Sequence, residues 1–516
     1  MDMNDVPIPP LLFYGRSYKN LGPAIEDLQS LDTNGEIDVV IIPPEVDEQT
    51  DEEDVDEEEM KMTLVPRDVP GSIEVHYDKS DDEYSSEDDI SLAVFRNQQL
   101  PKKKKTANPV WTKDPETDIS MPTARGCLDR LTILKAELEG RSPVEIFEKF
   151  IDKDVIDHIV FQSNLYAQQK NDYRFMFSES VMKIFLGFLL LTGYHSVPRE
   201  SMYWSLDEDL GIDLVTRSMS RNRFHDIKRN IHLADNTNLK KVDKMAKVRP
   251  LMDLMNQRFQ QWGFFHEELS IDESMVKYYG HNSSKQFIKT KPIRFGYKNW
   301  TLCSSTGYCY AFDTYCGAKT TETTHTLQDK LPLGSKVVLD LLKTIAVPSE
   351  HTLFFDNFFS CHSLMKTLKD LGYRATGTVR ENRTKKCPVI SVKEMKNKGR
   401  GSYDYMFDSE ALILFVRWKD NSVVTMATNY DSVLPMEKVK RWSSAVKGRT
   451  EVPQPFLFKN YNRGMGGVDL MDQSVNNYLP YCYTRKKMVV AFIYTYHKYG
   501  YLKYLANISV GIWRGC

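Results

Sequence analysis

The segment HTLFFDNF, residues 351–358, contains an apolar run that ends at a carboxylate, Asp356. Two further aspartates stand in a similar setting: Asp272 follows the apolar run 269–271, and Asp469 follows a valine at a helix start marked by two glycines. Short apolar runs predict buried strands, and a carboxylate at the end of such a strand is costly to desolvate unless it is paired, hydrogen-bonded or bound to a cation. Three such aspartates in one α/β region indicate a metal site.

The ligand type predicts which metal this site would take. Oxygen ligands without histidine or cysteine favour Mg²⁺ or Mn²⁺ over zinc. Two such ions on shared carboxylates can activate an attacking oxygen and stabilise the leaving oxygen of a phosphodiester. For any single aspartate, a role as a strand-end cap or turn residue is the alternative.

The sequence around these aspartates alternates strand and helix patterns from 269 to 377. Segments 296–305 and 307–317 predict a hairpin, and a helix with one apolar face follows. Then come the strand at 351–358 and a helix that ends at Gly372. This order predicts a central mixed sheet covered by helices.

Two flanking regions have a different texture. In the first, Ser142, Pro143 and Glu145 form a capping-box signature that predicts a helix start. Further helices are expected at 154–169, 179–193, 217–232 and 248–262. In the second, residues 400–430 contain short apolar strands joined by the polar turn 419–422, which predicts a β-rich insertion.

The first hundred residues are strongly acidic. They hold 27 acidic and 6 basic residues, whereas the rest of the chain holds 44 acidic and 62 basic ones. We expect residues 1–105 to be largely disordered, with segments 11–14 and 39–42 as docking segments or plain linker. The run PKKKK (101–105) resembles a nuclear import signal, or is a solvated tether. The basic remainder suggests a polyanion-binding body.

Composition narrows the cellular setting. The longest apolar runs, 184–191 and 488–496, fall short of the roughly 18 residues that a membrane span needs. The N-terminus lacks the pattern of a secretory signal, and the eight cysteines include no CxxC pair. We therefore expect no membrane insertion, reduced thiols, and a cytosolic or nuclear location.

Several motifs together resemble the piggyBac transposases, and in particular the transposable-element-derived proteins of that family. The matching segments are LSIDESMVKYYGH (269–281), KPIRFGYK (291–298), TLFFDNFFS (352–360), ATGTVREN (375–382) and YNRGMGGVDLMDQ (461–473). Their order, spacing and context all agree with that family.

The resemblance implies an α/β protein with an RNase H-like catalytic core, a β-rich insertion, and a helical N-terminal region for dimerisation and DNA binding. With the composition, it divides the chain into a disordered acidic head (1–105), the helical region (106–265), the first part of the core (266–385), the insertion (386–458), the last part of the core (459–497) and a short tail without a zinc module (498–516).

The resemblance also implies site residues and chemistry. The catalytic triad would be Asp272, Asp356 and Asp469, with Asp472 as a further metal ligand, holding two Mg²⁺ or Mn²⁺ ions. The family excises its element through a DNA hairpin and joins the ends at TTAA targets, which implies double-stranded DNA as partner, a homodimer and a nuclear location. The candidates for neutralising DNA phosphates are Lys289, Lys291, Arg294, Lys298 and Arg380.

Some features depart from that pattern. The 44 residues after Asp472 contain Cys482 and Cys516 without the spacing of the zinc-binding module that reads element ends in transposing members. A domesticated nuclear protein that binds DNA, or a chromatin partner through its acidic head, is therefore the alternative to an active transposase. Trp300, Trp418 and Trp442 could stack on bases, although burial in the core is the simpler expectation for each.

Overall fold

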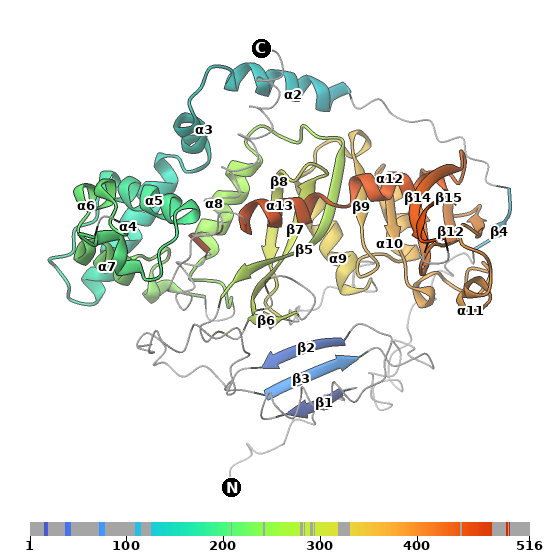
Figure 1. Ribbon diagram of the computed structural model, residues 1–516, viewed down its shortest axis with the longest axis horizontal. Coiled ribbons are helices and arrows are strands. Elements are labelled where there is room, and N and C mark those ends of the chain that lie inside the picture. The colour runs from blue at the N-terminus through green and yellow to red at the C-terminus, as the bar shows by residue number, and fades with distance from the viewer. Residues whose placement is uncertain are drawn as a thin grey trace, which may run out of the picture.

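The chain folds around one large mixed sheet with helices packed against it (Figure 1). The computed structural model describes residues 15–18, 37–42, 72–77, 109–114, 125–207, 209–240, 243–278, 282, 284–288, 293, 295–317, 331–443, 446–476, 492–493 and 495. Thirteen of the described strands join in the order β1-β3-β2-β6-β7-β5-β9-β10-β13-β12-β11-β4, with β8 paired to β7 off this path.

The strands of the described residues are numbered in chain order. They are β1 (Gly15–Tyr18), β2 (Ile37–Ile42), β3 (Ser72–Tyr77), β4 (Trp111–Thr112), β5 (Glu268–Lys277), β6 (Lys285–Phe287), β7 (Phe295–Ser304), β8 (Cys309–Thr314), β9 (Thr352–Phe355), β10 (Arg374–Thr378), β11 (Tyr403–Asp408), β12 (Ile413–Lys419), β13 (Val423–Thr428), β14 (Glu437–Ser443) and β15 (Gly448–Gln454).

The centre of the sheet has strand order β8-β7-β5-β9-β10. Strands β5, β9 and β10 run parallel, and β7 is antiparallel to both β5 and β8. Every residue of β9 is buried, which confirms the buried strand predicted from its apolar run. The hairpin of β7 and β8, which turns at Gly307 with a positive φ of 93°, is also confirmed.

The helices of the described residues fall into two groups. Those before β5 are α2 (Arg125–Leu138), α3 (Pro143–Phe150), α4 (Lys153–Gln169), α5 (Glu179–Tyr194), α6 (Asp213–Ser218), α7 (Arg221–Asn230) and α8 (Arg249–Phe259). Those after it are α9 (Leu333–Leu341), α10 (His362–Asp370), α11 (Val392–Lys396), α12 (Phe456–Gly464) and α13 (Gly467–Asn476). Helices α8, α9, α10, α11, α12 and α13 all contact strands of the sheet. None of the described helices is long and apolar enough to cross a membrane.

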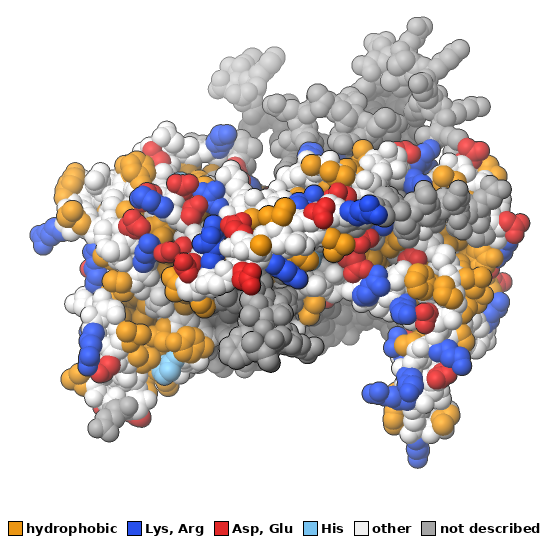
Figure 2. All heavy atoms as spheres, turned by 90° about the horizontal axis from the view of Figure 1, so that it is seen from above, with side chains coloured by type: hydrophobic (Ala, Val, Ile, Leu, Met, Phe, Trp, Pro, Cys, Tyr) orange, Lys and Arg blue, Asp and Glu red, His pale blue; other side chains and the backbone are white. Residues whose placement is uncertain are grey.

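The insertion after α11 mostly continues the sheet. Strand β13 pairs antiparallel with β10, and β12 and β11 follow it outward, so these strands extend the sheet rather than forming a separate module. The predicted turn at 419–422 joins β12 to β13 and is confirmed. Strands β14 and β15 instead form their own hairpin. In Figure 2 an arm projects from the body. Its place corresponds to the side of the molecule on which Figure 1 shows the β14–β15 hairpin, nearest to the viewer.

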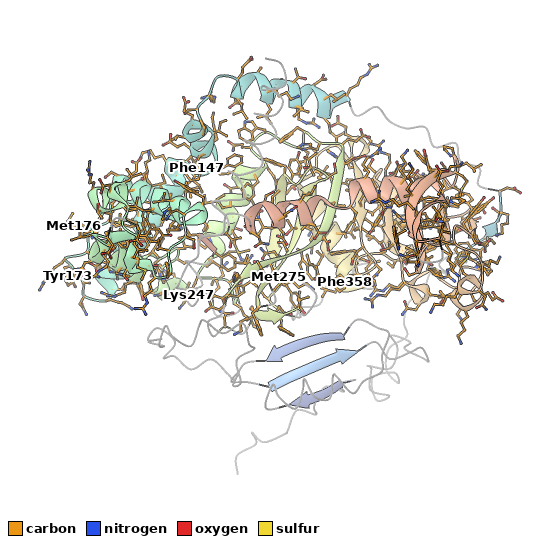
Figure 3. All side chains as sticks on the ribbon, viewed as in Figure 1. Phe147, Tyr173, Met176, Lys247, Met275 and Phe358 are labelled. Atoms are coloured by element: carbon orange, nitrogen blue, oxygen red, sulfur yellow. The ribbon has the colours of Figure 1, made fainter. Side chains whose placement is uncertain are left out.

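Helical packing confirms one prediction in detail and corrects another. Ser142 and Glu145 form the predicted capping box at the start of α3. The single helix expected at 217–232 is instead broken, because the Ser220 hydroxyl accepts a hydrogen bond from the Arg223 backbone N–H and caps a new helix, α7. Tyr173 lies at the outer end of this helical region, far from the sheet (Figure 3).

The acidic head contains three strands where disorder was expected. Strand β3 pairs antiparallel with β1 and β2, and β2 meets β6 at Val39 and Phe287. The β-branched sequences IDVVII and SIEVHY favour extended pairing despite the surrounding carboxylates. Segment 39–42 thus lies within β2. The expectation that residues 1–105 are largely disordered stays a prediction for the rest of the head. Segments 11–14 and 101–105 lie outside the described residues.

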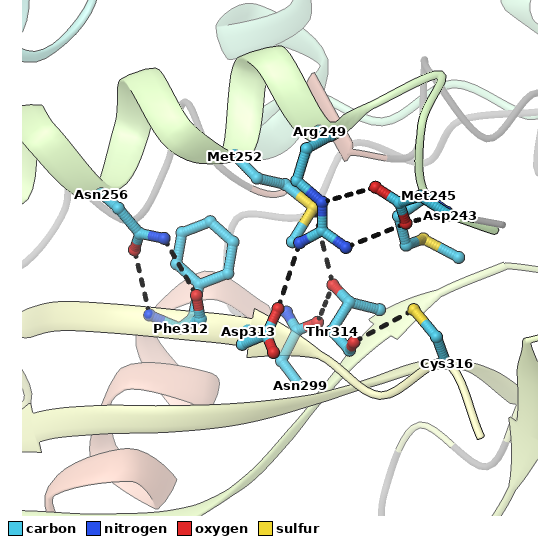
Figure 4. A network of polar contacts seen from close by, with 10 residues as sticks. All are labelled: Asp243, Met245, Arg249, Met252, Asn256, Asn299, Phe312, Asp313, Thr314 and Cys316. Carbon is cyan, nitrogen blue, oxygen red and sulfur yellow. Dashed lines mark hydrogen bonds and ion pairs between the residues drawn. The ribbon is translucent and has the colours of Figure 1, made fainter. Parts of the chain in front are cut away.

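A polar network fastens α8 to the edge strand β8 (Figure 4). The Asn256 side-chain amide donates to the Phe312 carbonyl at 3.0 Å and accepts from the Phe312 N–H at 3.0 Å, so it replaces a neighbouring strand. The Arg249 guanidinium bonds to both carboxylate oxygens of Asp243, at 2.9 and 3.1 Å, and to Asp313 at 3.1 Å. The Asn256 contacts satisfy backbone groups that an edge strand otherwise leaves open, and the Arg249 ion pairs link α8 to the Asp313 side chain of β8.

Replacing Asn256 by alanine removes both bonds to the β8 backbone. We expect Asn256→Ala to lower the free energy of unfolding by about 1–3 kcal/mol, since it leaves polar backbone groups without protein partners. Urea denaturation followed by circular dichroism measures the change. The control is Gln257→Ala, at the exposed neighbouring position of α8, which should change stability by less than about 0.5 kcal/mol. Equal stability of the two variants would contradict this role of Asn256.

Candidate active site

Asp272 and Asp356 lie side by side on neighbouring parallel strands. Ile271 of β5 is paired with Phe355 of β9, and each aspartate is the next residue along its strand direction. Adjacent strands lie about 4.8 Å apart, so the two residues are neighbours across the sheet. Asp356 follows the end of β9 as predicted, whereas the prediction of a strand end at Asp272 is wrong, because β5 continues to Lys277 through its pairing with β7. The sheet therefore brings together two of the predicted site residues, which are separated in sequence by a hairpin and a helix.

Local backbone contacts orient these two carboxylates, both of which are half-buried. Asp272 Oδ1 accepts a hydrogen bond from the Glu273 N–H at 2.8 Å. Asp356 Oδ1 accepts one from the Phe358 N–H at 2.9 Å, in the turn that follows β9. Each bond holds one oxygen of the carboxylate toward the backbone.

Helix α13, which carries the other two predicted ligands Asp469 and Asp472, packs against the same strand. A side chain at Gly467 would approach within 2.0 Å of the Ser304 carbonyl oxygen and 2.5 Å of the Ser270 hydroxyl, so glycine permits this contact with β7 and β5. Val468 and Met471 are buried toward the sheet, whereas Asp469 is exposed and Asp472 is half-buried. The helix start therefore lies against β5, beside Ser270, two residues before Asp272.

Tyr461 of α12 is a site residue that the sequence interpretation did not single out. Burial raises the pKa of its hydroxyl, and the charges of Asp356 and Asp272 raise that pKa further, while a hydrogen bond with the Thr378 side chain opposes them. The phenol is thus neutral and lies close to both carboxylates. It is the first residue of the quoted motif YNRGMGGVDLMDQ, which is the signal that could have identified it.

Lys298 is held within the protein rather than extended into solvent. Its ammonium forms an ion pair with Glu273 at 2.6 Å and lies 4.2 Å from the centre of the Trp300 ring. Its side chain is only 14% exposed. The ring of Trp300 also stacks on the ring of Phe358, which is labelled in Figure 3. These contacts indicate that Lys298 braces the segment that carries Asp272, while contact with DNA phosphates stays a prediction.

The remaining basic candidates divide into two groups. Arg380 donates from Nε to the Asn357 side chain at 3.1 Å, which places its half-buried guanidinium beside Asp356. Arg383 donates to the backbone oxygens of Asn357 and Phe358 at 3.1 and 2.7 Å and braces the same turn. The other three candidates, Lys289, Lys291 and Arg294, lie outside the described residues.

The three tryptophans differ in environment. Trp300 and Trp418 are each only 3% exposed, which confirms the expected core packing. Trp442 is 63% exposed, so the same expectation is wrong for it. A single tryptophan in a mixed polar segment carries too little pattern to separate these cases.

A second group of ligand-type side chains lies below the helix α2. Atoms of Cys127, Glu350 and His351 lie within 4.8 Å of one another. However, His351 Nδ1 lies 3.0 Å from the His266 carbonyl oxygen and so carries its proton, and Arg130 bonds to Glu350. Burial raises the pKa of the Cys127 thiol to about 11. A protonated thiol and a guanidinium do not suit a metal, and the group instead fastens α2 to the body.

The chain is similar in sequence to known proteins. A family model described as Transposase IS4 matches residues 142–497. PiggyBac transposable element-derived protein 3 of Homo sapiens is 35% identical over 476 residues, covering 88% of this chain and 78% of that protein. PiggyBac transposable element-derived protein 2 of Homo sapiens is 36% identical over 445 residues, covering 85% and 73%.

The fold has a counterpart among solved structures. A piggyBac transposase, in a cryo-EM structure of its synaptic complex with hairpin DNA, aligns with a TM-score of 0.57 and 22% identity over 70% of this chain and 74% of that one. A mixed α/β fold with aspartates on adjacent parallel strands, together with the matching family model, defines a transposase-type protein. Within that class, the chain belongs to the piggyBac transposase family, as its motifs predicted.

The contact at Gly467 can be tested by a matched pair of substitutions. We expect Gly467→Ala to force α13 away from β5 and β7 and to lower the free energy of unfolding by about 1–3 kcal/mol, the usual cost of overpacking. Gly466→Ala meets nothing within 4 Å and should be neutral or slightly stabilising. Urea denaturation of both variants compares them, and equal stabilities would show that α13 is not seated as described.

Proposed function

We propose that this protein is a metal-dependent DNA transposase of the DDD type that cleaves and joins phosphodiester bonds. The observation that carries the proposal is the adjacency of Asp272 and Asp356 on parallel strands, with α13 packed on the same β5. The strand order β8-β7-β5-β9-β10, antiparallel in its first part and parallel in its second, supports an RNase H-like core.

The donor set fits a hard divalent cation. Asp272, Asp356, Asp469 and Asp472 offer only carboxylate oxygens, which suit Mg²⁺ or Mn²⁺. Two half-buried carboxylates on adjacent strands repel each other, so a bound cation would stabilise their juxtaposition. When bound, two such ions polarise the scissile phosphate and lower the pKa of the attacking hydroxyl or water.

The chain's own residues would hold this arrangement in place. The neutral Tyr461 hydroxyl can donate a hydrogen bond to a carboxylate oxygen or to a phosphate oxygen beside it. Lys298 holds Glu273, the neighbour of Asp272, by their ion pair. Arg383 holds the turn after Asp356 through two backbone carbonyls. Such fixed positions reduce the reorganisation that phosphoryl transfer requires.

Double-stranded DNA is the partner we infer. The excess of basic residues after residue 100 suits a polyanion, and the piggyBac transposase with the similar fold is described as a synaptic complex with hairpin DNA. Joining at TTAA targets, a homodimer, a nuclear location and a chromatin partner for the acidic head are further parts of this proposal. They rest on the family resemblance, the run 101–105 and the charge of the head.

A non-transposing DNA-binding protein is the second candidate. The two human relatives carry names that describe them as derived from a transposable element, which favours a history of domestication. The four aspartates are all present here, which favours retained chemistry. Strand joining by the purified protein separates the two functions.

The decisive experiment joins a pre-cut DNA end to a TTAA-containing plasmid in the presence of Mg²⁺ or Mn²⁺. We expect Asp356→Asn to abolish joining while folding and DNA affinity persist, because the amide cannot supply the anionic metal ligand. Asp370→Asn, at an exposed position at the end of α10, is the matched control and should join normally. Absence of joining by the parent protein, with DNA binding retained, would leave the second candidate.

A further inference from the structure

The hairpin of β14 and β15 stands apart from the large sheet and has two unlike faces. Directly paired residues of an antiparallel hairpin point to the same side, and neighbours along a strand alternate. Lys440 is paired with Glu451, and Trp442 with Arg449, so these four side chains share one face. The opposite face carries residues such as Val439, which is paired with Val452.

The second face is anchored to the body. Val439 and Val452 belong to an apolar cluster with Leu457 and Phe458 of α12. Near the free end of β14, Arg441 donates to Asp420 at 2.8 Å. Asp420 lies in the turn between β12 and β13. The Arg400 guanidinium also contacts this turn and the hairpin: it donates to the other oxygen of Asp420 at 2.6 Å and to the Trp442 carbonyl oxygen at 2.9 Å. The hairpin is therefore held rigidly along this face.

The first face is open and basic. Lys438, Lys440, Trp442 and Arg449 are all exposed on it. Its acidic residue, Glu451, pairs with Lys438 at 3.1 Å, which leaves a net positive face. Segment 437–454 as a whole holds five basic residues and two acidic ones. In Figure 2, Lys and Arg side chains gather along the projecting arm that Figure 1 relates to β14 and β15.

We propose that this face binds DNA at the junction between a duplex and an unpaired end. Lys440 and Arg449 would contact phosphates, because two exposed cations on a rigid face with more basic than acidic residues suit a polyanion. Trp442, directly opposite Arg449 and two residues from Lys440, would stack on an unpaired base, since base faces inside a duplex are already covered. The proposal rests on the proposed function, and it adds a contact surface outside the aspartate site.

The fold connects this surface to the candidate active site. Strand β15 leads directly into α12, and Val452 packs in one cluster with Phe458 and Tyr461. Tyr461 is the side chain that lies close to both Asp272 and Asp356. DNA held on the hairpin would therefore be held on the same rigid unit as the site.

Fluorescence anisotropy of the full chain in EDTA tests the proposal with two labelled DNAs, a blunt duplex and one with a single-stranded overhang. We expect the double variant Lys440→Glu with Arg449→Glu to bind both DNAs at least about tenfold more weakly. The slope of log affinity against log salt should become less steep by about 1.8, from two lost phosphate contacts. Lys393→Glu with Lys396→Glu, at exposed positions of α11, makes the same charge change and should stay within about twofold of the parent.

The aromatic contact has its own variant. Trp442→Ala should weaken binding of the overhang DNA by about fivefold or more, and leave the blunt duplex within about twofold. Equal effects on both DNAs would overturn the stacking role. A double variant that matches the α11 control in affinity and salt slope, or a parent that binds neither DNA, would overturn the surface itself. Because no divalent metal is present, these outcomes are separate from loss of strand joining, which tests the proposed function.

Discussion

The candidate site depends on the parallel pairing of two buried strands. Strand β9 is buried throughout and β5 is buried over Leu269–Ile271, where the two strands pair, and the first carboxylate that follows each paired segment falls at the same level. Desolvation makes two neighbouring carboxylates unfavourable without a cation or hydrogen bonds. Backbone N–H groups of Glu273 and Phe358 offset this cost by donating hydrogen bonds to the two carboxylates. The phenol of Tyr461 lies close to both, and Arg380 and Arg383 hold the turn after Asp356.

Close contact between elements remote in sequence completes the arrangement. Gly464 of α12 lies where a side chain would come within 2.3 Å of the Phe354 ring, and Gly467 of α13 lies directly against β7 and β5. Without these two glycines the helices could not approach the sheet so closely. The same helices connect outward to the insertion, since Val452 packs with α12. Aspartates, helix contacts and hairpin are thus parts of one packed unit.

The sequence predicted what depends on local pattern and missed what depends on partners. The buried strand β9, the hairpin of β7 and β8, and the capping box of α3 follow from apolar runs and turn residues. The burial of Lys298 could not be predicted, because it requires Glu273 of the neighbouring strand β5 to pair with the ammonium, which also lies over the ring of Trp300, two residues along β7. Exposure of Trp442 likewise depends on which hairpin face the apolar cluster covers.

Pairing between distant strands was also beyond local pattern. The β-rich character of 400–430 was predicted, but the pairing of β13 with β10, by which this segment extends the sheet, could not be read from its sequence. The strands of the head, in a segment dominated by carboxylates, pair because β-branched residues suffice where a partner edge exists. Composition averages over such short segments and conceals them.

The place of α13 in the chain has a consequence for how the protein is made. Asp272 and Asp356 leave the ribosome early, but Asp469 follows only after the entire insertion has been synthesised. Contacts of such wide sequence separation form late, because loop closure must precede them. A nascent or prematurely terminated chain therefore holds two strands of the candidate site without the helix that completes it. The four aspartates of the candidate site can therefore come together only after the insertion has been translated.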